Sequence, residues 1–173
     1  GSKNLFQVTL FRSDVKNLIT WADVLGNGIW EACNVDKACL QGLETEVTFQ
    51  LTRQISCTLS YTYLDARDVG EEYNDNYLTY KPRQQVGGRL QYKGERGLKA
   101  NLGAEYTGST YSDRANTTKM DSYVLVDARV SQAVGKWTEI FISGKNLLDE
   151  EYEVINGYPM PGTIVMSGVK MIF

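Results

Sequence analysis

The sequence contains no histidine, only three prolines and no long run of apolar residues in its 173 positions. Without histidine, the chain cannot build a Ser-His-Asp or Cys-His catalytic arrangement or a His-ligated metal site. No stretch approaches the ~20 consecutive apolar residues of a transmembrane helix. No run of basic residues predicts binding to nucleic acid, and the formal net charge is −3. We therefore expect no enzyme activity, no catalytic residue, no metal site and no cofactor.

The length of the chain fits one domain with a sizeable core. The first two residues, Gly1 and Ser2, are typical of the scar that a cleaved expression tag leaves, so we assign the domain to residues 3–173. No signal peptide opens the chain. Because an engineered start would remove such a peptide, its absence says nothing about the compartment.

Cysteine is scarce, with three residues in the chain. Cys33 and Cys39 lie six positions apart, and a loop that short can close as a disulfide in an oxidising compartment. The alternative is a pair of free thiols. Cys57 has no evident partner and fits a strand as a small apolar residue.

Alternation with a period of two dominates what is present. In residues 97–107 the apolar and polar side chains sort onto opposite sides of an extended strand, which a helix would not achieve. Eight segments of this kind are expected as strands: 4–20, 41–52, 55–66, 83–93, 97–108, 121–134, 137–147 and 163–173. No connecting segment has a helical period. The pattern predicts an all-β, antiparallel up-and-down meander of about eight strands.

Short and long connections alternate along this meander. The long segments are 21–40, 67–82, 109–120 and 148–162, and the turns between them are tight. In an up-and-down sheet this alternation puts every short turn at one end and every long loop at the other. That asymmetry is typical of an outer-membrane β-barrel, with short periplasmic turns and long extracellular loops. We expect a transmembrane β-barrel segment; the alternative is a soluble β-sandwich with one solvated face.

The two faces of the strands support the membrane interpretation. Aromatic residues fall near both ends of the apolar face, as lipid-facing aromatic belts require. Tyr61, Tyr63 and Tyr106 are expected towards the long loops, and Phe49, Tyr92 and Phe173 towards the short turns. The charged residues of the polar face are expected to point inward and to pair in cross-strand ladders. These residues are Glu46, Arg89, Lys99, Glu105, Asp127 and Arg129.

At this point the sequence resembles a known family. The segments "VTLFRSDVKNLI", "LQGLETEVTFQL", "SYTYLDARD" and "YKPRQQVGGRLQY" look like the later strands of a TonB-dependent outer-membrane receptor of the siderophore-receptor type. "ISGKNLLDEEYEVINGYPMPG" is similar to the family's penultimate strand and last loop. One departure is Thr163, where the family usually has arginine after Pro-Gly. The resemblance covers residues 3–173 in order.

The resemblance implies the C-terminal portion of the receptor barrel, without its plug domain and its TonB-binding segment. It implies TonB-dependent uptake of a ferric siderophore or similar iron complex by the whole receptor, in the Gram-negative outer membrane. Cobalamin or another substrate is the alternative within the family. The implied partners are outer-membrane lipid, the ferric siderophore, the barrel assembly machinery, and TonB through the missing part. The loop residues expected to meet the ligand are Trp21, Trp30, Tyr73, Tyr77, Tyr111, Arg114 and Tyr158.

Two further interpretations remain open from the sequence. One is a small self-contained eight-stranded outer-membrane barrel that serves as an adhesin or a structural anchor. The other is a soluble lipocalin-like binder. The last strand favours the membrane: Val169, Met171 and Phe173 share one face, and by resemblance they form the signal that the barrel assembly machinery reads. Either eight strands close as a small barrel or open edges pair with other chains.

Overall fold

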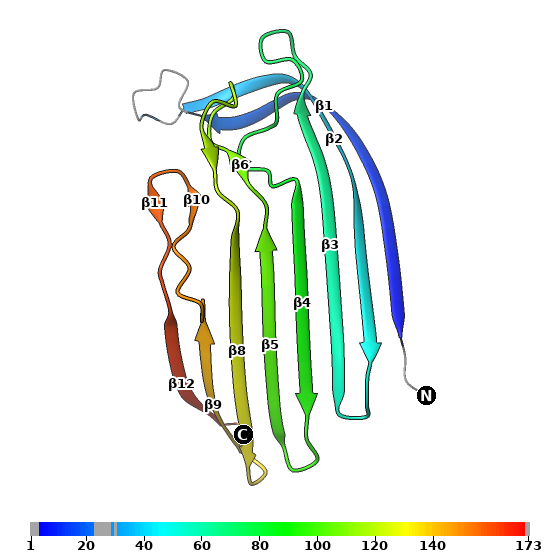
Figure 1. Cartoon of the computed structure of the whole chain (residues 1–173), viewed down its shortest axis with the longest axis vertical. Coiled ribbons are helices and arrows are strands. Elements are labelled where there is room, and N and C mark those ends of the chain that lie inside the picture. Colours follow the sequence, from blue (N-terminus) through cyan, green and yellow to red (C-terminus); the bar gives the residue numbers. More distant parts are fainter. Residues whose placement is uncertain (1–3, 23–28, 30, 172–173) are drawn as a thin grey trace.

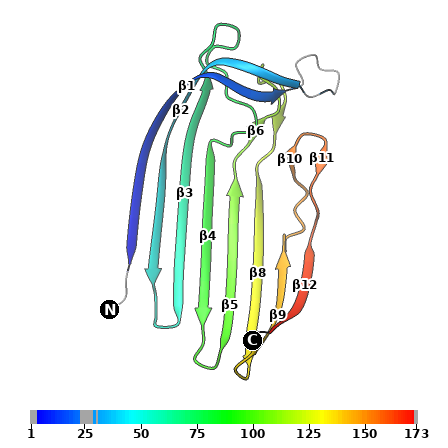
Figure 2. The same cartoon turned by 180° about the vertical axis from the view of Figure 1, so that it is seen from behind.

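The computed structural model describes residues 4–22, 29 and 31–171. It is an open, eight-stranded antiparallel sheet in which the strands follow one another in chain order, apart from two small hairpins (Figures 1 and 2). The strands of the sheet are β1 (Leu5–Ala22), β2 (Glu31–Gln50), β3 (Ile55–Asp68), β4 (Gln84–Lys93), β5 (Leu98–Thr107), β8 (Tyr123–Val134), β9 (Thr138–Lys145) and β12 (Ile164–Met171). The hairpins pair β6 (Thr110–Tyr111) with β7 (Lys119–Met120), and β10 (Glu153–Ile155) with β11 (Tyr158–Pro159). The meander predicted from the sequence is thus confirmed.

Long loops and short turns lie at opposite ends of the sheet, as the alternation of lengths predicts. Figures 1 and 2 show both small hairpins and the β3–β4 loop at one end, and the tight turns at the other. Among the described residues β1 and β12 each have a neighbour on one side only, so the sheet is not closed into a barrel. No helix in the described part of the chain is long and apolar enough to cross a membrane.

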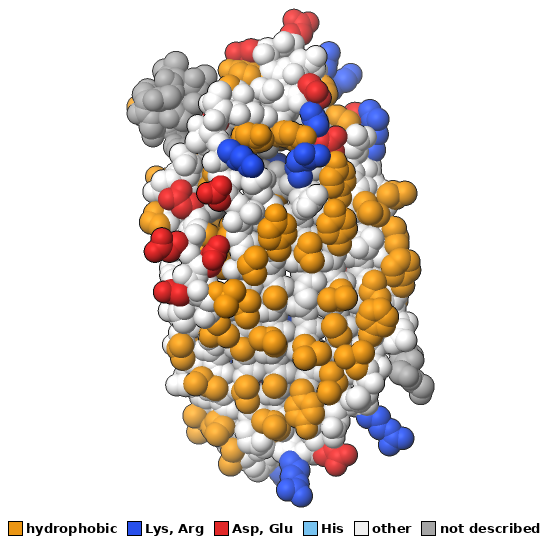
Figure 3. Space-filling view, in the orientation of Figure 1, with side chains coloured by type: hydrophobic (Ala, Val, Ile, Leu, Met, Phe, Trp, Pro, Cys, Tyr) orange, Lys and Arg blue, Asp and Glu red, His pale blue; other side chains and the backbone are white. Residues whose placement is uncertain are grey.

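The register of the ladders puts the alternating residues on two distinct faces. One cross-strand row runs through Val8, Thr45, Tyr61, Val86, Tyr106 and Val124. Large apolar side chains on this side are open to the surroundings: Leu102 is 49% exposed and Ile142 54% exposed. Figure 3 shows them as a broad band across the strands, with charged side chains at its two ends. A monomeric soluble protein rarely exposes so large an apolar patch, so this outer face fits lipid.

The aromatic residues of the outer face occupy the expected levels. Tyr61 and Tyr106 share the row towards the long loops, and Tyr63 lies one step further along β3. Tyr92 pairs with Ile55 next to a short turn, and Phe49 pairs with Cys57 at the same end. These positions confirm both predicted belts, except that Phe173 lies outside the described residues.

At the long-loop end the two faces exchange character. Beyond a boundary row formed by Leu10, Leu43 and Tyr63, the outer face carries charged and polar pairs. Examples are the 3.1 Å ion pair between Arg12 and Asp14, and the 3.4 Å bond that Gln41 donates to Asp65. The inner face there holds the small core of the chain, in which Ala38, Ala66 and Leu78 are buried against Val15, Leu18, Leu40 and Leu64. The strands therefore continue beyond the apolar band, and their outer face there is polar, as expected for a part of the barrel wall that is exposed to water.

The first predicted loop is shorter than expected. Residues 31–40, assigned to a loop from the sequence, belong to β2 and pair with β1 up to Ala22. The extension includes an apolar pair, Ala38 opposite Val15, but also a pair of like charges, Lys16 opposite Lys37. Figure 1 shows these ends of β1 and β2 leaning across the long-loop end of the sheet. Asn17 lies in this segment with a φ of 56°, a conformation that asparagine tolerates.

Candidate functional site

The polar inner face is hollowed into an open cavity of about 680 Å³. Residues of both charge signs line it from β2, β4, β5, β8 and the end of β9: Glu46, Arg89, Glu105, Asp127, Arg129 and Lys145. They alternate along each strand with the apolar residues of the outer face, so the cavity follows directly from the period of two. The inner face can therefore hold water or a polar partner.

Ion pairing on the inner face is sparser than the sequence predicts. Glu139 accepts a 2.9 Å bond from Lys99 and lies 3.9 Å from Arg129, whose guanidinium also sits 3.8 Å above the Phe141 ring. In the described part of the chain, Glu46, Arg89, Glu105 and Asp127 form no ion pair with each other. The expected ladder is wrong for these four, because the register sets them opposite glycine or uncharged residues.

The loop between β3 and β4 docks on the loop between β5 and β8 through asparagines. The side-chain amide of Asn116 accepts the Tyr77 backbone N–H at 2.7 Å and donates to the Tyr77 carbonyl at 3.0 Å. Asn76 donates to the Arg114 carbonyl at 2.9 Å. Asn116 adopts a φ of 57°, which asparagine tolerates. Its side-chain amide pairs with both backbone groups of Tyr77, as the backbone of a neighbouring strand would. Two loops that are distant in sequence are thereby joined.

Two of the predicted ligand residues meet on the inner side of these loops. The Arg114 guanidinium donates to Asp68 at 2.9 Å, and Asp68 is only 3% exposed. The same guanidinium lies 4.4 Å from the centre of the Tyr73 ring. Asp68 also accepts the Gly70 N–H at 2.8 Å and so shapes the turn that leads to Tyr73. The arrangement holds a cation against an aromatic face beside the core.

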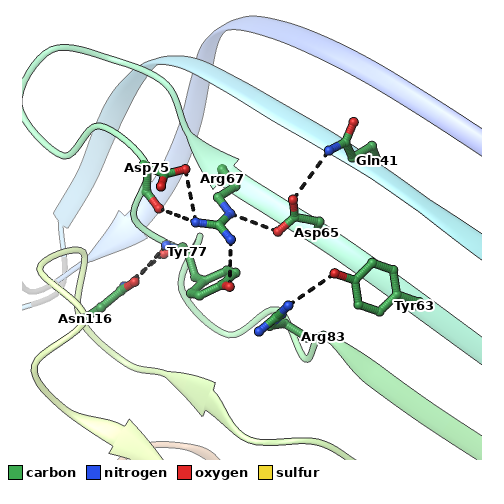
Figure 4. A network of polar contacts seen from close by, with 8 residues as sticks. All are labelled: Gln41, Tyr63, Asp65, Arg67, Asp75, Tyr77, Arg83 and Asn116. Carbon is green, nitrogen blue, oxygen red and sulfur yellow. Dashed lines mark hydrogen bonds and ion pairs between the residues drawn. The ribbon is translucent and has the colours of Figure 1, made fainter.

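Tyr77 and Tyr111 lie together but on the other side of the wall. Their rings stack with centroids 6.1 Å apart and planes 6° apart. Tyr77 pairs with Arg67, which is on the outer face with Asp65 and Tyr63. Figure 4 shows Arg67 surrounded by Asp65, Asp75 and Tyr77, and Arg83 reaching the Tyr63 hydroxyl. The sequence analysis missed Arg67 and Arg83, whose roles depend on contacts across the loop.

Asn146 organises the last long loop. The residue is 5% exposed and its backbone has a φ of 49°. Its side-chain amide exchanges two 2.9 Å hydrogen bonds with the backbone of Glu150. The backbone carbonyl of Asn146 accepts a 2.7 Å bond from the Thr163 hydroxyl, and the Asp149 carboxylate accepts the Thr163 N–H at 2.8 Å. The "NLLDEEY" segment therefore ties the start of the loop to the start of β12. Thr163, which stands where the family usually has arginine, contributes its hydroxyl to this connection.

Tyr123 and Tyr152 form a second aromatic pair that sequence reasoning missed. Their ring centroids are 4.5 Å apart, and Tyr123 is on the inner side of β8 with Leu125 and Asp127. Tyr158, which the sequence predicts as a ligand residue, lies apart in β11 and is 64% exposed. The Trp21 backbone belongs to β1 but its side chain is not described, and Trp30 lies outside the described residues.

The predicted disulfide between Cys33 and Cys39 is wrong. Cys39 is a free thiol, and both residues belong to the single strand β2. An extended strand rises ~3.3 Å per residue, so six steps separate the two α-carbons by ~20 Å, far beyond the ~7 Å limit for a disulfide. The short spacing suggested closure only because this segment was expected to be a loop.

Asp113 fixes the turn that carries Asn116. Its carboxylate accepts the backbone N–H groups of Thr117 and Thr118 at 3.0 and 2.6 Å, and the Thr117 hydroxyl at 3.0 Å. Burial alone would raise the pKa of Asp113, but the hydrogen bonds together outweigh burial and lower it. The carboxylate therefore stays ionised and keeps its acceptors available to the turn.

Comparison with known proteins gives a consistent result. The family model described as "TonB dependent receptor-like, beta-barrel" matches residues 1–147. The vitamin B12 transporter BtuB of Photobacterium profundum is 33% identical over 150 residues, which cover 85% of this chain and 24% of that protein. The ferrioxamine receptor of Yersinia enterocolitica is 26% identical over 162 residues, covering 88% of this chain and 22% of that protein.

A solved structure gives the same fold. The ferric yersiniabactin uptake receptor FyuA of Yersinia pestis superposes with a TM-score of 0.76 at 17% identity, over 98% of this chain and 28% of that one. At this identity the likeness concerns the fold alone. The chain spans about a quarter of the length of these two curated relatives.

Proposed function

The chain belongs to the TonB-dependent receptor β-barrel family, and from this premise we propose that it is part of the wall of a receptor that imports an iron complex across the outer membrane. Residues 3–173 are the C-terminal portion of that barrel, and the plug domain lies elsewhere in the receptor. Relatives in this family are β-barrels of the Gram-negative outer membrane. The observation that carries the proposal is a sheet with an apolar outer face, a hollowed polar inner face, and loops docked together at one end.

A ferric siderophore is the substrate that we propose. The relative that binds ferrioxamine supports this choice, and so does the chemistry of the loops. Ferric siderophores are often anionic and aromatic, and an arginine held against a tyrosine can meet both properties by charge and by stacking. Tyr73 and Arg114 provide such a pair on the inner side.

The Tyr123–Tyr152 pair is proposed to extend this ligand surface. It stands on the inner side, near Asp127, where a ligand entering the lumen would pass. Tyr77 and Tyr111 are not retained as ligand residues, because they lie on the outer face with Arg67. The exposed Tyr158 keeps its place as a candidate at the rim of the loops.

Cobalamin is the second candidate substrate. It is favoured by the 33% identity to a vitamin B12 transporter over 85% of the chain. In either case the family consists of receptors and transporters rather than enzymes, and we propose no catalytic role. TonB would act on the receptor through segments outside this chain, and the barrel assembly machinery would read Val169, Met171 and Phe173.

Uptake by cells tests the proposal. A strain that lacks its own receptors and expresses the full-length gene encoding this chain should accumulate radioactive iron from a ferric siderophore, and only when TonB is present. Tyr123→Ala and Arg114→Gln should reduce uptake, while Tyr158→Ala should have the smaller effect and Lys136→Gln, in a short turn, none. Uptake of radiolabelled cobalamin instead of iron would select the second candidate. Uptake of neither, with the receptor present in the membrane, would overturn the transport proposal.

A further inference from the structure

A set of cationic and aromatic side chains lies on the outer face, at the long-loop border of the apolar band. We call Tyr63, Tyr77, Arg83, Tyr111 and Lys119 the border cluster. The Arg83 guanidinium donates to the Tyr63 hydroxyl at 3.2 Å and stands 4.8 Å from the centre of the Tyr77 ring. These two contacts hold the Arg83 charge beside tyrosines that face outward.

The cluster extends from Tyr77 towards β6 and β7. Tyr77 stacks on Tyr111, and Tyr111 is directly opposite Lys119 in the small β6–β7 ladder. Residues directly opposite each other in an antiparallel pair project to the same face. The Lys119 side chain is therefore on the same side of its hairpin as the stacked tyrosines.

Neither Arg83 nor Lys119 forms an ion pair within the described part of the chain, although Asp65 acts on Arg83 from a greater distance. Both residues are exposed, and no described carboxylate lies within ion-pair distance of either one. Arg67, close by, differs because it forms ion pairs with Asp65 and Asp75 at 2.9 and 3.0 Å. Arg83 and Lys119 thus offer two open cationic sites next to a neutralised one.

The position of the cluster decides which anion can reach it. Tyr63 belongs to the boundary row, with the exposed apolar band directly below it. On the inner side of the wall at this level, Leu78 packs on Ala38 and Ala66. Figure 3 shows blue side chains along this border of the orange band, beside its uppermost aromatic residues. None of its five residues lines the inner cavity, so we take the headgroup layer of the membrane as the source of the anion.

We propose that the border cluster binds the phosphate of a membrane lipid headgroup, with Arg83 and Lys119 supplying the charge. Arginine suits this role because its planar guanidinium donates several hydrogen bonds to phosphate oxygens. Tyrosines at such a border have a buried ring and a hydroxyl that reaches the polar layer. The lipid chains would lie along the apolar band below. The cationic cluster would thus contact the headgroup, and the apolar band would contact the chains.

Lipid binding to the receptor purified from outer membranes in detergent tests this proposal. Native mass spectrometry would compare dioleoylphosphatidic acid with dioleoylglycerol, which has the same chains without the phosphate. The receptor should retain the phosphate lipid and not the neutral one. Arg83→Gln with Lys119→Gln should weaken retention about fivefold for each charge removed, as expected for a basic residue at a membrane surface.

Controls separate this site from general attraction and from misfolding. Lys136→Gln removes an exposed lysine at the short-turn end and should change retention less than twofold. Lys119→Gln alone keeps the Arg83 contacts intact and should still weaken retention about fivefold. Equal losses in Lys136→Gln and Lys119→Gln, or equal retention of the two lipids, would overturn the proposal. Displacement of the lipid by inorganic phosphate alone would also overturn it, because the site would then recognise a free anion.

Discussion

Replacing Asn146 by alanine should open the base of the last long loop while leaving the sheet intact. The change removes two 2.9 Å hydrogen bonds with the Glu150 backbone and a weaker one of 3.4 Å to the Pro161 carbonyl. At about 1 kcal/mol for each good hydrogen bond, the loss is about 2 kcal/mol. Alanine in the left-handed backbone conformation that Asn146 adopts, with φ 49°, adds about 1 kcal/mol. We therefore expect the closed loop to lose about 3 kcal/mol of its stability.

Amide hydrogen exchange at Met160, whose N–H donates to the Tyr152 carbonyl across the same loop at 2.9 Å, measures this loss. Because about 1.4 kcal/mol corresponds to a factor of ten, exchange should be accelerated about a hundredfold. Asn146→Gly separates the two causes, because it removes the hydrogen bonds without adding backbone strain. The closed loop should then lose only about 2 kcal/mol of its stability. Asn156→Ala, an exposed asparagine in the tip of the same loop, is the matched control and should change nothing. Unchanged Met160 exchange in Asn146→Ala would refute this account of the loop.

Three further changes test other parts of the structure. Asn116→Ala should release the docking between the two long loops, seen as a broader distance distribution between spin labels on them; an unchanged distribution would count against this docking. Gly42→Ala puts a methyl group against a backbone carbonyl and a phenylalanine ring, and should cost about 1–3 kcal/mol in urea unfolding from lipid. Gly88→Ala is its control, since its new methyl group meets only a side-chain carbon at 3.6 Å and should cost under about 0.5 kcal/mol. The pKa of Asp113 is lowered from the usual carboxyl pKa of 3.8, so the turn should stay closed at pH values above 3.8 and open only at lower pH. An NMR titration of Asp113 with a midpoint at or above pH 3.8 would contradict this.

The regular part of the wall could be predicted because it depends on local alternation. Each strand between Leu43 and Val134 shows a clear period of two, and the register then gives its outer and inner faces. The first part of β2, residues 31–40, was missed because the period there no longer means apolar outside and polar inside. Beyond the boundary row the outer side carries Arg12 and Asp14, and the inner side carries small apolar residues.

The loop contacts could not be predicted, because they join residues far apart through single side chains. Asn116 binds a backbone segment 39 positions away, and no local pattern in the sequence identifies so distant a partner. The sequence predicted Tyr73, Tyr77, Tyr111 and Arg114 as ligand residues, and all four lie in the long connections between strands of the sheet. It could not assign them to the inner or outer side, which depends on how β3 continues into its loop.

The central claim is that one face of this sheet meets lipid and the other meets a watery lumen. Spin labels placed one at a time along β5, in the receptor reconstituted in lipid, test it most directly. Accessibility to oxygen, which concentrates in lipid, should peak at residues 98, 100, 102 and 104. Accessibility to a water-soluble nickel complex should peak at residues 99, 101, 103 and 105. Two profiles that rise and fall together, or that alternate with the opposite phase, would contradict the account.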